Sequence, residues 1–161
     1  MQLAELNIAA LTAPLESPEI FEFREFIPAV NALAENAPGF VWRLKGDESE
    51  SSTDLATTPW DYDPRIIVNM SVWADLESLR NFTFTTAHSY FLRSRKKWFV
   101  HLPHPTTVLW WVADGHEPSL AEARARLDLL EKEGPTEGAF TFHRPFPAPA
   151  DTGATVSAGR R

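Results

Sequence analysis

The sequence predicts an α+β protein whose strands and helices follow one another in the ferredoxin-like order βαββαβ, with accessory helices. The segment 66–99 gives the clearest indication. Apolar residues at Ile66, Val68 and Met70 recur at strand spacing, and after Asp75 the period becomes helical. A strand therefore leads directly into a helix, and the patterns of the flanking segments place the other elements around this unit.

The segment Gln2–Ala9 is the first predicted strand. Leu6 and Ile8 point to one side of it, whereas Glu5 and Asn7 point to the other, because successive side chains alternate across a strand. This strand is therefore expected to have an apolar core face and a mixed face.

The first helix is expected to begin at Ser17 or Pro18, since proline suits a first helical position, and to end within 36–39. Its apolar stripe consists of Phe23, Phe26, Ile27, Val30 and Leu33. A second strand is expected at Phe40–Lys45. The polar segment Gly46–Tyr62 that follows is rich in turn residues and is expected to be a long loop.

The C-terminal half continues the alternation of strands and helices. In order, it is expected to contain a strand at Arg65–Trp73, a helix capped by Asp75, a further helix from Thr85 or Thr86 to about Val100, a strand at Thr107–Ala113, a helix at Pro118–Glu133 and a short extended arm at Ala139–His143. Residues 1–147 are expected to form one domain. Residues 148–161 are small, polar and unpatterned, which predicts a disordered tail.

Composition narrows the class of protein. A chain of 161 residues is long enough for one domain with a substantial core, and the absence of cysteine excludes disulfides and thiolate chemistry. No apolar run is long enough to span a membrane, and the N-terminal segment does not resemble a secretory signal, so a cytoplasmic protein is expected. A net charge of −7 argues against a nucleic-acid partner.

The expected sheet has its helices on one face only. Its other face then needs a cover, and a second sheet packed face to face would provide one. The sequence therefore predicts a homodimer that encloses a cavity between its subunits.

Six segments together support a resemblance that extends over roughly residues 2–147. They are QLAELNIA, PGFVWRL, IVNMSVWADLESLRNF, AHSYFLRSRKKWF, VLWWVADGHEPSLAEA and GPTEGAFTFHRPFP. The chain resembles the domain-of-unknown-function family 3291, which is assigned to the dimeric α/β-barrel superfamily together with antibiotic-biosynthesis and haem-degrading monooxygenases. The resemblance implies the dimeric α/β-barrel fold, whereas the family carries no established reaction.

The candidate site residues are those expected to line the cavity. Asn7 and Asn69 lie on strands that are neighbours in this fold and point to the same side, where each amide needs a hydrogen-bond partner or a ligand. The alternative is that the two asparagines bond to each other or to water. Trp42, Trp73 and Trp110 or Trp111 are expected to supply flat apolar walls.

His88 is expected on the inner face of a helix, near its first turn, where the macrodipole favours a neutral imidazole. Such a histidine is suited to accept a proton or to bind a metal, and the alternative is a buried structural role. Haem-degrading relatives use an asparagine on strand one, which Asn7 matches, and a tryptophan on helix two, where this chain has Phe82. Arg95 is expected to steady an anionic group. His101 and His104 lie beside prolines and are interpreted as loop residues, so no metal site is assigned to them.

Two functions from different classes follow from these residues. The first is a monooxygenase-like enzyme acting on an apolar or aromatic small molecule, in which Asn7 and Asn69 orient the substrate and His88 acts as base or axial ligand. The second is a non-catalytic dimeric protein that binds a hydrophobic ligand or haem. Haem and no cofactor are equally compatible with the sequence, and the substrate is not identified.

Overall fold

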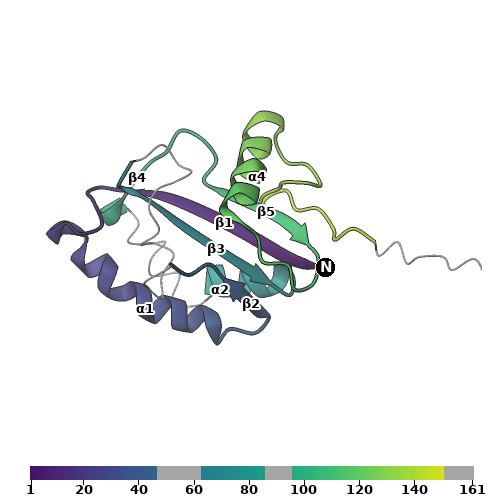
Figure 1. Cartoon of the computed structure of the whole chain (residues 1–161), viewed down its shortest axis with the longest axis horizontal. Coiled ribbons are helices and arrows are strands. Elements are labelled where there is room, and N and C mark those ends of the chain that lie inside the picture. Colours follow the sequence, from purple (N-terminus) through teal and green to yellow (C-terminus); the bar gives the residue numbers. More distant parts are fainter. Residues whose placement is uncertain (47–62, 86–95, 151–161) are drawn as a thin grey trace, which may run out of the picture.

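The β-sheet is the frame on which the other elements pack, and the computed structural model describes it within residues 1–46, 63–85 and 96–150. Its strands are β1 (Gln2–Leu11), β2 (Phe40–Arg43), β3 (Ile66–Trp73), β4 (Phe99–Val100) and β5 (Thr107–Val112). β1 is central, because it pairs with β3 on one side and with both β5 and β4 on the other. β2 pairs with β3, and every pairing is antiparallel. The order β2-β3-β1-β5 is ferredoxin-like, as predicted (Figure 1).

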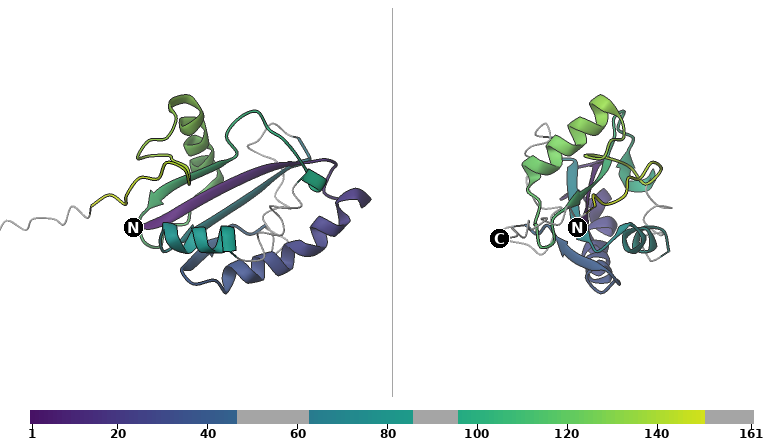
Figure 2. Two further views of the ribbon diagram at one scale, coloured as in Figure 1. Left: turned by 180° about the vertical axis from the view of Figure 1, so that it is seen from behind. Right: turned by 90° about the vertical axis from the view of Figure 1, so that its right-hand side faces the viewer.

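The helices lie on both faces of this sheet. They are the short 3-10 helix η1 (Pro18–Ile20), α1 (Phe21–Glu35), α2 (Leu76–Thr85) and α4 (Leu120–Glu133). Figure 2 shows α4 on one side of the sheet and α1 with α2 on the other. Within the described ranges, no helix combines the length and the apolar character that crossing a bilayer requires.

Side-chain alternation divides the core between the two faces. Leu6, Ile8, Val68 and Met70 pack against α4, in a cluster that we call the α4 cluster. The opposite face carries two clusters. The α1 cluster consists of Leu11, Ile20, Phe23, Ile27, Ile67 and Trp98, and the α2 cluster of Leu3, Trp73, Leu79, Leu109 and Phe140. Glu5 lies between Leu3 and Leu11 on the face that carries these two clusters.

The expectation that helices cover only one face is wrong. The residues that were predicted to share a face do share one. However, α1 and α2 cover the face of Glu5 and Asn7, whereas α4 covers the face that carries Met70 and Val72. Both of these apolar residues are fully buried within a single chain. The face of Glu5 and Asn7, which was expected to be bare and so motivated the homodimer, is therefore covered by α1 and α2 within one chain, and the homodimer stays a prediction.

Most element boundaries agree with the sequence, with one exception. The helix expected to run to about Val100 does not reach it, because Phe99–Val100 forms β4 and pairs with Ala10 and Leu11 at the end of β1. Pairing with a strand that is distant in sequence outweighs the local helical pattern here. Residues 86–95 of that expected helix, nearly all of the expected loop Gly46–Tyr62 and the segment 151–161 of the expected tail lie outside the described residues.

The C-terminal arm is part of the core. Phe140 and Leu109 exchange two backbone hydrogen bonds of 2.8 Å, which adds the arm to the free edge of β5. The Phe140 side chain is fully buried, and Phe142 and Phe146 pack against the same α2 cluster. The predicted docking of the arm through these phenylalanines is therefore observed.

Gly39, at the turn before β2, is expected to tolerate no side chain. Its φ of 79° is strained for other residues, and an added Cβ would overlap the side chain of Ser78. Gly115 has a similar φ of 78° but nothing within 4 Å of the added atom. Gly39→Ala should therefore destabilise the protein by about 1–3 kcal/mol more than Gly115→Ala in urea unfolding. Equal losses for the two variants would show that Ser78 moves aside at little cost.

Candidate functional site

A row of polar side chains crosses the sheet on the face covered by α1 and α2. Arg43 of β2 lies directly opposite Ser71 of β3, and Ser71 lies directly opposite Glu5 of β1. Directly opposed residues in antiparallel strands share a face, so the three side chains project to the same side. Arg43 and Ser71 are buried, at 7% and 8% exposure, and Glu5 is half-buried.

A second row lies beside the first. Asn69 of β3 is opposite Asn7 of β1, and Asn7 is opposite Thr107 of β5. The amide Nδ2 of Asn7 donates a hydrogen bond of 2.7 Å to Oγ1 of Thr107. Asn7 and Thr107 are half-buried and Asn69 is exposed, so this row is open to solvent. We call the two rows together the polar band, which comprises Glu5, Asn7, Arg43, Asn69, Ser71 and Thr107.

Glu5 is the titratable group at the centre of the polar band. The hydroxyl of Ser71 donates to Oε2 of Glu5 at 3.1 Å, and the indole Nε1 of Trp73 donates to the same hydroxyl oxygen at 2.9 Å. Burial raises the pKa of Glu5 to about 7, against the opposing effect of the Ser71 hydrogen bond. At neutral pH the carboxyl group is therefore divided between its protonated and ionised forms, as a general acid or base requires.

Aromatic side chains are concentrated in the clusters on either side of the polar band. In the α1 cluster, Phe23 contacts Trp98 with ring centroids 5.7 Å apart. In the α2 cluster, Trp73 stacks on Phe82 at 5.1 Å and meets Phe40 edge to face at 5.4 Å. A carboxyl group between two such clusters is poorly solvated, which explains its raised pKa.

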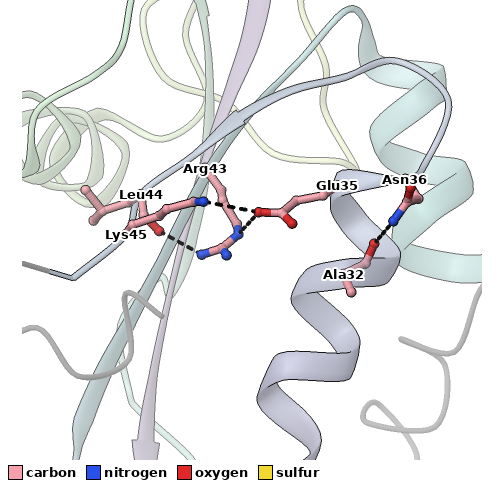
Figure 3. A network of polar contacts seen from close by, with 6 residues as sticks. All are labelled: Ala32, Glu35, Asn36, Arg43, Leu44 and Lys45. Atoms are coloured by element: carbon pink, nitrogen blue, oxygen red, sulfur yellow. Dashed lines mark hydrogen bonds and ion pairs between the residues drawn. The ribbon is translucent and has the colours of Figure 1, made fainter. Parts of the chain in front are cut away.

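Arg43 is anchored at the crossing of α1 and β2. Its Nε donates to Oε1 of Glu35 at 2.9 Å, and the same oxygen lies 3.7 Å from Nζ of Lys45 (Figure 3). Nη1 of Arg43 makes a long contact of 3.5 Å with the carbonyl oxygen of Leu44. One carboxylate at the end of α1 thus holds two cations at the end of β2.

Comparison with known protein families assigns the chain to one of them. The family model described as domain of unknown function (DUF3291) matches residues 2–155. The chain belongs to the DUF3291 family. Among curated proteins, no sequence matches this DUF3291 chain.

Two solved structures are similar to this DUF3291 protein. One is the NE2512 protein of unknown function from Nitrosomonas europaea, with 12% sequence identity, a TM-score of 0.48, and coverage of 73% of this chain and 95% of the other. The second is SnoaB, a cofactor-independent oxygenase from Streptomyces nogalater, with 15% identity, a TM-score of 0.44, and coverage of 73% of this chain and 98% of the other.

The structure brings two of the predicted site residues together and places a third on the same face of the sheet. Asn7 and Asn69 are direct neighbours across β1 and β3, and Trp73 shares their face. The indole of Trp73 is fully buried, so it supports the site through Ser71 and its ring offers no open shelf. His88 and Arg95 lie outside the described residues.

The placement predicted for Trp42 and Trp110 is wrong, because both belong to the α4 cluster on the opposite face. Trp42 is opposite Val72, and Trp110 is opposite Ala4. The indole Nε1 of Trp110 donates to Oε1 of Glu122 at 2.9 Å, which is a structural contact. The sheet therefore separates these two tryptophans from the polar band. Trp111, the predicted alternative to Trp110, lies opposite Leu3 on the face of the polar band and packs against the same α2 cluster as Trp73.

Sequence reasoning did not select Glu5, Ser71 or Arg43 as site residues. The strand alternation placed Glu5 and Ser71 on the face of Asn7, but a glutamate on a first strand resembles an ordinary exposed residue. The signal for Arg43 was its position in the apolar segment Phe40–Lys45, where a charged side chain needs a partner. Its pairing opposite Ser71 depends on strand register, which the sequence does not specify.

Two hollows bordered by described residues lie away from the polar band. One of about 400 Å³ lies beside α2, next to Asp75, Ser78 and Phe82, and one of about 190 Å³ lies beside α4, next to His104 and Arg124. Among the residues that the structure describes, no group of three His, Asp or Glu side chains is arranged to hold a metal ion. None of the six described residues that make up the polar band is a histidine that could bind haem iron, so no chemical step is assigned to haem.

Proposed function

We propose that this DUF3291 protein is a monooxygenase-like enzyme that oxidises an apolar, aromatic small molecule, with Glu5 as the general base. The observation that carries the proposal is the position of Glu5, a poorly solvated carboxyl group with a pKa raised to about 7, between two aromatic clusters. A base with a pKa near the working pH combines a useful ionised fraction with good proton affinity.

The proposed reaction needs molecular oxygen and no external reductant. The carboxylate of Glu5 takes a proton from an activated CH2 group of the substrate, and the resulting carbanion donates an electron to O2. Recombination of the two radicals forms a C–O bond and a peroxide, which accepts the proton held by Glu5. Loss of water from the hydroperoxide then converts CH2 and O2 into C=O and H2O. The balance is complete, because the carbon loses the four electrons that reduce O2.

The other residues of the polar band have positioning roles in this proposal. Asn7 and Asn69 orient the substrate through their amide groups, as expected from the sequence, and Asn69 is the exposed member of the polar band. Trp73 and Ser71 hold the carboxyl group of Glu5 in place by their two hydrogen bonds. Roles for His88 as a second base or ligand and for Arg95 as an anion-binding residue stay predictions.

Oxygen uptake tests the role of Glu5. Purified protein is supplied with fused-ring ketones that carry an activated methylene group, such as 2-tetralone, and O2 consumption is followed with an electrode. Glu5→Gln keeps the shape and removes the base, so turnover should fall about 10²–10⁴-fold while substrate binding persists. Glu25→Gln, at an exposed position on α1, is the matched control and should retain full turnover.

The results would also separate the two functional classes. A Glu5→Gln variant that consumes oxygen within a few-fold of the unaltered protein would exclude Glu5 as the base. Binding of several aromatic compounds without any oxygen uptake would instead favour the non-catalytic binding protein predicted as the alternative function.

A further inference from the structure

The C-terminal arm, residues 139–150, is joined to α4 by a short connection that folds back on itself. α4 ends at Glu133, and the chain returns to β5 through residues 134–138 (Figure 1). Within this connection, Thr136 and Ala139 close a tight turn with backbone hydrogen bonds of 2.8 Å and 3.3 Å. The arm therefore docks on its own chain only because the connection bends sharply.

The turn buries a hydroxyl group without a partner. Oγ1 of Thr136 is shielded from solvent, and it makes no hydrogen bond within the part of the chain that the structure describes. A buried hydroxyl group that makes no hydrogen bond destabilises the conformation that buries it. The folded-back turn thus carries an energetic cost that an extended connection, open to water, would not have.

The surface that receives the arm holds it as a binding site holds a peptide. Phe140 pairs with Leu109 at the edge of β5, and beyond this pair side chains donate hydrogen bonds to the backbone of the arm. Nε1 of Trp111 donates to the carbonyl oxygen of Phe146 at 2.9 Å. Nη2 of Arg80 donates to the carbonyl oxygen of Phe142 at 2.5 Å. We call this surface the arm-docking surface, which comprises Arg80, Phe84, Leu109 and Trp111.

The arm has the sequence of a preformed extended ligand. Pro145, Pro147 and Pro149 alternate with other residues, and proline favours an extended backbone that loses little entropy on binding. Phe140 is its apolar anchor and is fully buried. An extended segment with its own anchor makes the same contacts with the arm-docking surface whichever copy of the chain carries it.

We propose that two copies of this chain exchange their arms, so that residues 139–150 of each copy occupy the arm-docking surface of the other. The exchanged dimer keeps the contacts of the docked arm, and it replaces each folded-back turn by an extended connection in which the Thr136 hydroxyl reaches water. Since the monomer and the exchanged dimer differ mainly in this connection, the cost at Thr136 favours exchange. A homodimer of this kind needs no bare sheet face, and it is independent of the proposed oxidation.

Molar mass as a function of protein concentration tests the exchange. Samples are incubated until the arm has had time to undock, and their mass is measured by light scattering after size-exclusion chromatography. The fraction of dimer should rise with concentration. Thr136→Val removes the unpaired hydroxyl from both turns, so it should weaken the dimer by about 10–100-fold. Glu137→Gln, an exposed change in the same turn, is the matched control and should leave the dissociation constant unchanged.

A shorter connection provides a second test. Deleting Glu137 and Gly138 removes the residues between the two that close the turn, so the arm can no longer fold back on its own chain. This variant should be dimeric at concentrations at which the unaltered protein is monomeric. A folded monomer would contradict the exchange. If the deletion prevents folding, Thr136→Val still decides: an unaltered protein that stays monomeric, or equal dissociation constants for the two, would overturn the proposal.

Disulfide trapping shows which copies are in contact. The sequence contains no cysteine, so single cysteines can be introduced without competing thiols. Phe84 and Phe142 meet edge to face, with ring centroids 5.4 Å apart. Phe84→Cys and Phe142→Cys chains that are mixed, incubated and oxidised should form a covalent dimer that joins the two variants. Phe84→Cys mixed with Ala125→Cys, at an exposed position on α4, should not. Dimers that lack the first cross-link would associate through another surface, which would refute arm exchange.

Discussion

Replacing Glu5 with glutamine is expected to stabilise the folded protein at pH 8 by about 3 kcal/mol. In the unfolded chain the carboxyl group has its ordinary pKa of 4.5, whereas burial raises it to about 7 in the folded state. Between these two values the folded state binds more protons than the unfolded state, so stability falls as the pH rises through this window. The difference corresponds to about 3 kcal/mol at 1.36 kcal/mol for each tenfold change in proton affinity. Glutamine has no such charge to desolvate.

Urea unfolding between pH 4 and pH 8.5 measures this effect. The stability advantage of Glu5→Gln should be small at pH 4, where the native carboxyl group is protonated, and should grow up to about pH 7 and then level off. Glu25→Gln alters an exposed carboxylate and should give a curve parallel to that of the unaltered protein. A Glu5→Gln curve that is also parallel would mean that Glu5 is well solvated and unsuited to act as a base at neutral pH.

Truncating Phe140 is expected to destabilise the protein by about 3–5 kcal/mol, the usual cost of removing a large aromatic side chain from a core. Phe140 is fully buried in the α2 cluster, with its ring centroid 6.3 Å from that of Trp111 and 6.0 Å from that of Phe146. The cavity left by Phe140→Ala would also weaken the attachment of the arm to β5. The free energy of unfolding in urea provides the measurement.

A second phenylalanine provides the comparison for Phe140→Ala. Phe84 is 53% exposed and contacts Phe142 edge to face, so Phe84→Ala should cost less than about 1 kcal/mol. If the two variants lose similar stability, the arm is not part of the cooperative core. A loss confined to Phe140→Ala would confirm that residues near the C-terminal end of the domain help to build the α2 side of the site.

Local patterns predicted most of the strands and helices. The alternation within 66–73, the cap at Asp75 and the glycine at position 134 each depend on neighbouring residues, and β3, α2 and the end of α4 lie where these signals place them. The strand at Phe99–Val100 escaped prediction because its pairing with Leu11 is non-local. A backbone that finds a partner strand overrides the helical tendency of its sequence.

The candidate site was predicted only in part. Asn7 and Asn69 were expected to share a space, and the register places them directly opposite each other. The placement of Trp42 and Trp110 was wrong, since alternation states which residues share a face but not what covers that face. Glu5 was not predicted as a site residue, because its raised pKa comes from its burial in the folded protein, which local sequence patterns do not specify.

The sequence by itself determined the order of the elements, the division of each strand into two faces and the aromatic content of the core, because these depend on interactions between near neighbours in the chain. Only the tertiary structure decided that α4 covers one face while α1 and α2 cover the other, and that Arg43, Ser71 and Glu5 form one row. Those features depend on how distant segments pack and on the register between strands. The poor solvation of the Glu5 carboxyl group follows from that packing. The chemistry proposed for this protein depends on the raised pKa that results.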